Sequence, residues 1–248
     1  MLVAHICAKS FDDPSSRGRR DAYFLRDGSV SVIVSVFGAS GRSGRAFISA
    51  ASTAGLTLRL HYRSAPEDVA PELATVVVGA LKDPTAVREV LRGSDASVIL
   101  FGPRPSARDR VFSAKATTAI VDGMRTQAQR RLLCVTGAMM GALPSNLSLL
   151  SRLTTLVQRR LGNDDLDDDR AEQERIVRGS GLDWTLVKTP ALTESASTET
   201  YLAALDLKIG KDSQLTRTSL ARFILDELVA KQYLQKTVYV GSAAVSTR

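Results

Sequence analysis

Short apolar runs alternate with segments whose apolar residues recur every three or four positions over most of the 248-residue chain. Apolar runs bounded by turn residues predict buried strands, and the periodic segments predict amphipathic helices. The predicted strands are residues 29–37, 57–63, 75–80, 96–102, 131–137, 183–190 and 236–241. The predicted helices are residues 45–55, 84–93, 113–127, 171–181 and 219–232. This alternation favours an α/β fold: a doubly wound, mainly parallel sheet with helices on both faces, in a single domain.

Two segments interrupt the alternation and define the expected domain organisation. Residues 1–30 are polar, basic and rich in Ser, Asp and Arg, which predicts an N-terminal arm of irregular structure. The folded domain is expected over residues 31–248. Within it, residues 139–170 form an insertion that contains a loop, an amphipathic helix and an acidic run. Insertions at the carboxyl ends of strands commonly form the substrate side of a site.

Composition excludes several classes of protein. No apolar run reaches the ~20 residues that a membrane-spanning helix needs, and the first residues lack a secretory leader pattern. The only cysteines are Cys7 and Cys134, and the only histidines are His5 and His61. Such sparse ligands favour neither a disulfide framework nor a metal centre. We therefore expect a cytoplasmic protein with no metal, no membrane partner and a small-molecule substrate.

A glycine-rich turn joins the first predicted strand to the first predicted helix. The segment "VFGASGRSG", residues 36–44, places Gly38, Gly41 and Gly44 three positions apart. Glycines at such a turn let the backbone approach a diphosphate, and the N–H groups at the start of the following helix point at the anion. An ordinary glycine-rich turn is the alternative. The strand–turn–helix–strand context favours a Rossmann-type site for a dinucleotide.

The residues after the second predicted strand favour NADP(H) over NAD(H). An Asp or Glu there would accept hydrogen bonds from the ribose hydroxyls of NAD, but this chain has Arg63 and Ser64. A guanidinium matches a phosphate, and Arg42 adds a second cation in the turn. The net charge is +7, and no acid occurs between Asp27 and Glu67. Cations gathered around the turn favour a small polyanion over nucleic acid; the alternative is that Arg63 is only a solvated strand end.

Several segments, in order, carry a family resemblance. They are "VFGASGRSG", "LHYRS", "VVVGALKDPTAVREVLRGSDASVILFG", "LLCVTG", "GSGLDWTLVKTPALT" and "LTRTSLARFILDEL". Together they resemble the NmrA-like, atypical short-chain dehydrogenase/reductase group, and within it the biliverdin reductase B/flavin reductase type of NAD(P)H-binding protein. The resemblance covers residues 31–241. It is specific for fold and cofactor and weak for substrate.

The resemblance implies a position around NADP(H) for each matching residue. Those positions are Gly38, Ser40, Gly41, Arg42 and Ser43 at the phosphates; Arg63 and Ser64 at the 2′-phosphate; Ala80 and Leu81 at the adenine; Phe101, Gly102 and Arg104 at the ribose; and Thr136, Gly137, Pro190, Ala191 and Leu192 at the nicotinamide. The substrate pocket would be lined by Met139, Met140, Leu143 and Leu192, whose alternative role is plain core.

Departures from the family pattern leave the proton donor open. No Tyr has a Lys four residues later, Gly137 stands where relatives often have Ser, and Ala80 replaces a common Asp. The candidate catalytic residues are Thr136, Asp169 and Arg170. For Thr136 the alternative is a hydroxyl that bonds the backbone. For Asp169 the favoured alternative is an acid that opens a helix and complements its dipole.

These observations predict an NADP(H)-dependent oxidoreductase that acts on a flat apolar or aromatic molecule in specialised metabolism. Because the nicotinamide supplies the hydride, the protein mainly has to orient the substrate. One alternative is a redox-neutral cyclase or isomerase of the Diels–Alderase type that uses bound NADP(H). The other alternative is a non-enzymatic regulator that senses NADP.

Overall fold

One eight-stranded sheet runs through the protein. The structure is a computed structural model that describes residues 32–66, 74–102, 112–138, 164–194, 200–209 and 213–242. The strand order is β3-β2-β1-β4-β5-β6-β10-β8. Their bounds are β1 Ile33–Phe37, β2 Thr57–Tyr62, β3 Ala74–Val78, β4 Ala96–Ile99, β5 Arg131–Gly137, β6 Asp183–Thr189, β8 Tyr201–Ala204 and β10 Lys236–Ser242. Neighbouring strands are parallel except β10 and β8, which are antiparallel. A separate parallel pair is formed by β7 (Ala191–Thr193) and β9 (Gln214–Thr216).

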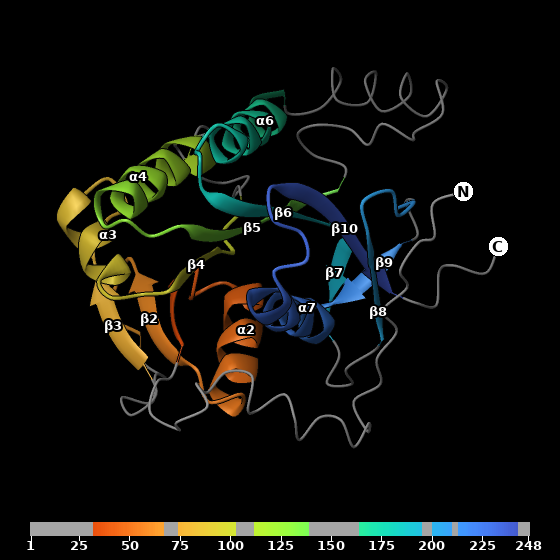
Figure 1. The fold of residues 1–248 in the computed structure, drawn as a ribbon, viewed down its shortest axis with the longest axis horizontal. Helices are drawn as coiled ribbons and strands as arrows, with labels where there is room; N and C mark the ends of the chain where they lie inside the picture. The colour runs from red at the N-terminus through yellow and green to blue at the C-terminus, as the bar shows by residue number, and fades with distance from the viewer. Residues whose placement is uncertain are drawn as a thin grey trace.

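Helices cover both faces of the sheet, as Figure 1 shows. Their bounds are α2 Arg42–Thr53, α3 Pro84–Leu91, α4 Phe112–Thr126, α6 Asp164–Arg178 and α7 Arg217–Ala230. Helices α2 and α7 pack together in one layer, and α3, α4 and α6 form the other. Two apolar cores result: Phe47 and Phe223 belong to the first, and Ile120 and Met124 to the second. Among the described residues, no helix is both long and apolar enough to cross a membrane.

The predicted Rossmann-type α/β class is confirmed, with differences at particular elements. The strands predicted at 29–37 and 96–102 correspond to β1 and β4, which are shorter than predicted. The short strands β7, β8 and β9 were not predicted. The predicted helix at 171–181 instead begins at Asp164, so α6 takes up most of the acidic run. The expected arm at 1–30 and residues 139–163 of the insertion lie outside the described residues, so this division of the chain stays a prediction.

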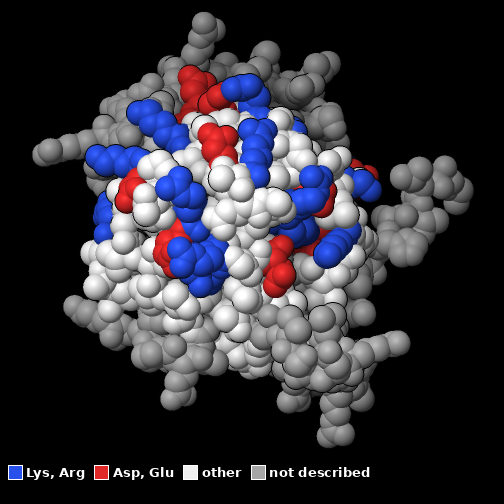
Figure 2. Space-filling view, turned by 60° about the vertical axis from the view of Figure 1, so that its left-hand side comes forward, with Lys and Arg blue, Asp and Glu red and all other residues white. Residues whose placement is uncertain are grey.

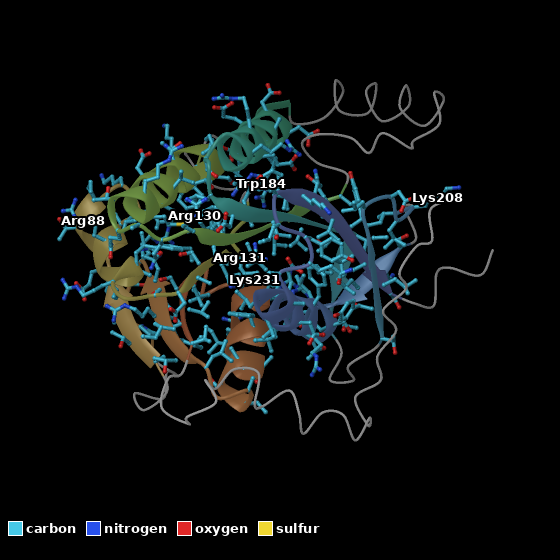
Figure 3. The ribbon with its side chains drawn as sticks, in the orientation of Figure 1. Arg88, Arg130, Arg131, Trp184, Lys208 and Lys231 are labelled. Atoms are coloured by element: carbon cyan, nitrogen blue, oxygen red, sulfur yellow. The ribbon has the colours of Figure 1, made fainter. Side chains whose placement is uncertain are left out.

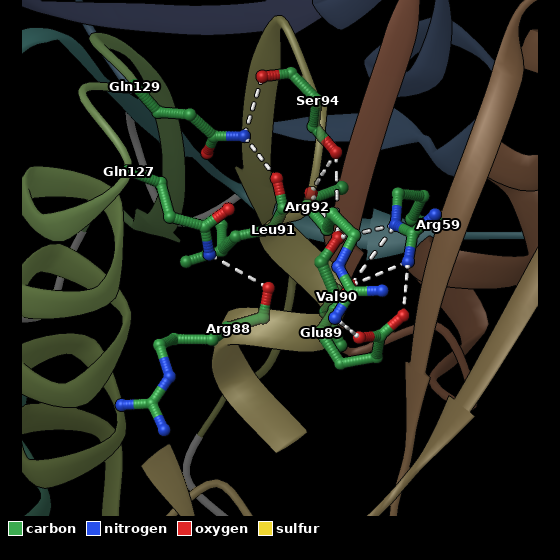
Figure 4. Close-up of polar contacts among 10 residues, drawn as sticks. Arg59, Arg88, Glu89, Val90, Leu91, Arg92, Ser94, Gln127 and Gln129 are labelled. Carbon is green, nitrogen blue, oxygen red and sulfur yellow. Dashed lines mark hydrogen bonds and ion pairs between the residues drawn. The ribbon is translucent and has the colours of Figure 1, made fainter. Parts of the chain in front are cut away.

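Side chains from three other elements complete the carboxyl end of α3, drawn in Figure 4. The last carbonyl groups of a helix have no partner within it and need donors from elsewhere. Gln127 donates to the Arg88 carbonyl, and Gln129 donates to the Leu91 carbonyl. Arg59 donates to the carbonyls of Glu89 and Val90, and Ser35 also donates to the Val90 carbonyl. Arg59 also pairs with the Glu89 carboxylate at 2.9 Å. These bonds tie α3 to β1, β2 and the turn before β5.

Cations and anions are interspersed on the face that carries α3 and β3 forward, as Figure 2 shows. Ion pairs occur on α3 and on the neighbouring α4, for example between Arg92 and Glu89 at 2.6 Å and between Arg125 and Asp122 at 3.4 Å. The net positive charge is therefore not gathered into one basic patch on this face.

We expect Gln129→Ala to lower the free energy of unfolding by about 2–3 kcal/mol, because two buried carbonyls lose their donor. The Gln129 amide nitrogen lies 2.5 Å from the carbonyl oxygens of both Leu91 and Ser94. Gln127→Ala, which removes one bond at an exposed position, is the matched control and is expected to cost less than about 1 kcal/mol. Urea unfolding measures both; equal losses would contradict the role given to Gln129.

Candidate functional site

The strand order reverses between β1 and β4, and the carboxyl ends of such strands are where a doubly wound sheet is expected to form its ligand-binding crevice. In doubly wound sheets, ligands bind at such a switch point. The glycine turn follows β1, and Phe101 and Gly102 follow β4, so both predicted sets of cofactor residues meet here. The amide of Leu100 also donates to the Phe37 carbonyl at 2.8 Å, which joins the two strand ends.

The first and third glycines of the turn are required by close contacts. Gly38 has φ 98°, and a Cβ there would lie 2.6 Å from the backbone nitrogen of Phe101. A Cβ on Gly44 would lie 2.2 Å from the carbonyl oxygen of Gly38. No larger residue fits either position without a backbone shift. The turn therefore lies tightly against both the end of β4 and the first turn of α2.

The amino end of α2 fits an anion. Gly41 caps this helix without a side-chain hydrogen bond, and no acid occurs in its first turn. The first N–H groups of a helix lack partners within it and carry a partial positive charge. Ser40, which is exposed, and Ser43, which is half-buried, lie on either side of the first residue of α2. The predicted phosphate residues thus come together in one turn.

Two arginines lie near the end of β2, and sequence reasoning assigned no role to one of them. Arg63 and Ser64 are exposed immediately after β2, where a 2′-phosphate is expected. Arg45 donates to the Ser40 carbonyl at 3.0 Å. Burial raises the pKa of Tyr62, the last residue of β2, and the nearby charge of Arg45 opposes that rise. The only sequence signal for Arg45 was its position one residue beyond the turn.

The predicted adenine and ribose residues lie along the next two strand ends. Ala80 and Leu81 follow β3, and Leu81 is largely buried in the core. Phe101 stacks edge-on against Phe112, with ring centroids 5.4 Å apart. Arg104, expected near the ribose, lies outside the described residues.

A buried ion pair lies directly beside Thr136 at the end of β5. Glu174 of α6 and Lys188 of β6 are each 0% exposed, and their charged atoms Oε1 and Nζ are 2.5 Å apart. The Thr136 hydroxyl lies 3.1 Å from the same Glu174 oxygen, and Arg178 contacts the other at 3.0 Å. A carboxylate oxygen accepts hydrogen bonds, so the Thr136 hydroxyl donates its proton to Glu174.

Thr136, Lys188 and Tyr239 form one row across three neighbouring strands. Thr136 is opposite Lys188 in the β5–β6 register, and Lys188 is opposite Tyr239 in the β6–β10 register. Burial and the charge of Glu174 raise the pKa of Tyr239, so its hydroxyl is neutral. Tyr239 packs in one cluster with Ala138, the residue after Gly137. The sequence search looked for a Tyr–Lys pair along one helix and missed this row.

Asp169 and Arg170 do not open a helix, which corrects the sequence-based interpretation. Both lie in the second turn of α6, and the Asp169 carboxylate caps a different helix, α4. It accepts from the backbone N–H of Ser113 at 2.9 Å and of Ala114 at 2.8 Å. The acid therefore complements the dipole of α4.

Arg170 is 5% exposed and covers the end of β4. Its guanidinium donates to Gln173 and, at 3.4 Å, to the Phe101 carbonyl. A Cβ on Gly102 would lie 2.7 Å from a guanidinium nitrogen, so Gly102 leaves room for this side chain. The Arg170 Nε has no hydrogen-bond partner among the described residues. A catalytic role for Asp169 or Arg170 stays a prediction.

The segment after β6 lies across from the glycine turn. Pro190 is buried, and Leu192 is half-buried in β7. The Glu194 carboxylate that follows β7 lies 3.7 Å from the Arg42 guanidinium. This contact brings the predicted nicotinamide-side residues near the turn. The predicted substrate residues Met139, Met140 and Leu143 lie outside the described residues.

A cavity of ≈ 360 Å³ occurs at the opposite, amino-terminal edge of the sheet. Arg130, Arg131 and Lys231, labelled in Figure 3, line it. Arg130 pairs with Asp183 at 3.1 Å, and the buried Arg131 pairs with Glu227 at 2.7 Å. This cavity is far from the switch-point crevice, and both arginines serve ion pairs that join β5 to its neighbours.

The fold and the glycine turn define a Rossmann-type dinucleotide-binding protein. A family model described as NAD(P)H-binding matches residues 38–231, and the chain belongs to that family. This confirms the cofactor class expected from the sequence.

Solved structures of low identity share the fold. A short-chain dehydrogenase/reductase from Veillonella parvula, in complex with NADP, is 17% identical, with a TM-score of 0.69 over 86% of this chain and 95% of that one. The oxidoreductase YlbE from Lactococcus lactis is 13% identical, with a TM-score of 0.68 over 85% and 91%. A candidate NADH-flavin reductase from Streptococcus pneumoniae is 18% identical, with a TM-score of 0.67 over 86% and 100%.

We expect Cys134 to resist alkylation in the folded protein. Burial raises the pKa of this thiol to about 12, with Glu174 adding to the rise and Arg170 and Lys188 opposing it. The reactive thiolate is therefore negligible at pH 8. In a Cys7→Ser variant, iodoacetamide at pH 8 should modify the protein only after urea unfolding, as measured by mass spectrometry. Rapid modification of the native variant would contradict the burial of Cys134 beside these charged side chains.

Proposed function

We propose that this chain is an NADP(H)-dependent oxidoreductase that reduces a flat, conjugated small molecule. The observation that carries the proposal is the combination of a tight glycine turn with three nearby arginines, at 42, 45 and 63, and no carboxylate in the described stretch 32–66. A carboxylate there would favour NAD(H), and cations favour the additional phosphate. When bound, the cofactor supplies a hydride from its nicotinamide ring.

The residues at the crevice suit each part of the dinucleotide. The amino end of α2, with the turn residues and Arg42, would hold the diphosphate. Arg63 and Ser64, together with Arg45, would hold the 2′-phosphate, because a guanidinium binds phosphate in a forked geometry. Ala80 and Leu81 would flank the adenine.

Phe101 and Gly102 would border the ribose, and Thr136, Gly137, Pro190 and Leu192 would surround the nicotinamide. Thr136 is a positioning residue in this proposal. Its hydroxyl proton is used by Glu174, so its oxygen offers lone pairs to an N–H donor, such as the carboxamide of the nicotinamide. It is therefore poorly suited to protonate a substrate oxygen.

Charge at the crevice favours a substrate that becomes more negative when it is reduced. Arg170 and Lys188 contribute two buried cations, and Arg178 contributes an exposed one. The anions beside them are Glu174, which pairs with Arg178 and Lys188, and Asp169, which caps α4. Buried cations stabilise developing negative charge more strongly than solvent-exposed ones do. Quinones and flavins accept a hydride to give stabilised anions and require no proton at that step. Such acceptors fit the hydroxyl arrangement at Thr136.

The same arrangement also suits a redox-neutral cyclisation in specialised metabolism, the second candidate. A site whose Thr136 hydroxyl already donates to Glu174 can shape an apolar substrate without reducing it. Product formation that requires NADP(H) without a net change in its absorbance would favour this candidate. Cofactor binding without turnover, together with a co-purifying protein, would favour the NADP-sensing regulator.

We expect Arg63→Gln to weaken NADP⁺ binding by about 1–3 kcal/mol, because a charge-assisted bond to the 2′-phosphate is lost. Binding of NAD⁺, which lacks that phosphate, should stay within twofold of the wild type, on the order of 0.4 kcal/mol. Isothermal titration calorimetry measures both. Arg88→Gln is the matched control, because Arg88 is an exposed arginine on α3. Unchanged NADP⁺ affinity in the Arg63 variant would remove the assignment of the 2′-phosphate site.

We expect Thr136→Val to lower kcat for NADPH oxidation by menadione about ten- to a hundredfold, because the ring is then less well oriented. Thr136→Ser keeps the hydroxyl and should restore most of the rate. Stopped-flow absorbance at 340 nm follows the reaction, and calorimetry checks that the dinucleotide still binds. A Val variant as fast as the wild type would show that Thr136 does not position the nicotinamide.

A further inference from the structure

One carboxylate links the glycine turn to the amino end of α7. The Glu194 oxygen Oε1 lies 2.9 Å from a terminal nitrogen of Arg217 and 3.7 Å from one of Arg42. Arg217 is the first residue of α7, and Arg42 is the first residue of α2. Pairing of Thr193 with Thr216 in β7 and β9 brings Glu194 and Arg217, the residues that follow them, together. Two helix starts and two cations therefore face one internal anion.

Arg217 is incompletely satisfied by this contact. It is 8% exposed, and its Nε has no hydrogen-bond partner among the described residues. Burial lowers the pKa of Arg217, Glu194 raises it and the nearby charge of Arg42 lowers it. A buried guanidinium with an unused donor is costly, and two cations that share one carboxylate keep a net positive charge. The cluster has the charge and donors for a larger anion.

We propose that Arg217 and Arg42 together bind the diphosphate of the dinucleotide, and that Glu194 is an internal competitor that occupies these arginines when the diphosphate is absent. This inference rests on the proposed position of the cofactor at the glycine turn. A diphosphate carries more charge and more acceptor oxygens than a carboxylate and can engage both guanidinium groups. The Glu194 and Arg42 side chains are 63% and 68% exposed, so Glu194 can turn into solvent at small cost.

Glu194 also follows the β7 residues that are expected beside the nicotinamide. Exchange of its carboxylate for a diphosphate would therefore couple the position of β7 to cofactor binding. No covalent step is involved, because the exchange only replaces one ion pair with another.

Calorimetric titration of the full-length protein tests the exchange. NADP⁺ carries the diphosphate, inorganic pyrophosphate provides it alone, and adenosine 2′-monophosphate lacks it. We expect Glu194→Gln to tighten NADP⁺ and pyrophosphate binding roughly two- to fivefold, the size of an exposed ion pair. Arg217→Gln should weaken both by roughly ten- to a hundredfold, the size of a charged hydrogen bond. Neither variant should change the affinity for adenosine 2′-monophosphate.

Two further variants control the test. Arg222→Gln removes another arginine of α7, whose partner is Asp226, and should leave all three affinities unchanged. Arg217→Lys keeps the charge and replaces Arg217→Gln if that variant fails to fold; we expect it to weaken NADP⁺ binding less. If the wild type binds NADP⁺ and Glu194→Gln binds it equally well or more weakly, this inference alone is overturned. Absence of NADP⁺ binding by the folded wild type would overturn the proposed function as well.

Discussion

The close approach of Gly38 to the backbone nitrogen of Phe101 is the constraint on which the site depends. It holds the turn after β1 against the end of β4, where the strand order reverses. A side chain at position 38 would separate the two strand ends and move the start of α2 with them. Because Gly44 packs against the same turn, the helix start and both strand ends lie in close contact with one another. The helix dipole is thereby aimed at the crevice.

Charge buried beside this unit gives the crevice its chemical character. Removing Glu174 and Lys188 from water costs several kcal/mol per ion, and each compensates the other only while both are present. The Thr136 hydroxyl and the Lys188 ammonium contact the same Glu174 oxygen. The direction in which the Thr136 hydroxyl donates its proton therefore depends on an ion pair between α6 and β6. The chain has no Tyr followed by a Lys four residues later, whereas Lys188 lies on β6, opposite Tyr239 of β10.

The mainly parallel α/β sheet and the glycine-rich turn could both be predicted from the sequence, because apolar runs and glycine spacing are local signals. The position of Arg63 directly after a strand was also predictable, and its role at the 2′-phosphate stays a prediction. Lys188 was not, because β6 is buried along nearly its whole length and shows no alternation that would assign a face. Glu174 is one of several charged residues in α6, and only packing against β5 distinguishes it. Asp169 was misplaced because an acidic run resembles a helix start, whereas its partners belong to α4, more than 50 residues away along the chain.

The most direct test of the central claim is a crystal structure of the protein grown with saturating NADP⁺. The account predicts the diphosphate at the amino end of α2, within hydrogen-bond distance of the backbone between Gly38 and Ser43, and the 2′-phosphate against Arg63. Well-ordered crystals that show the dinucleotide elsewhere, or that leave this turn without it, would contradict the account.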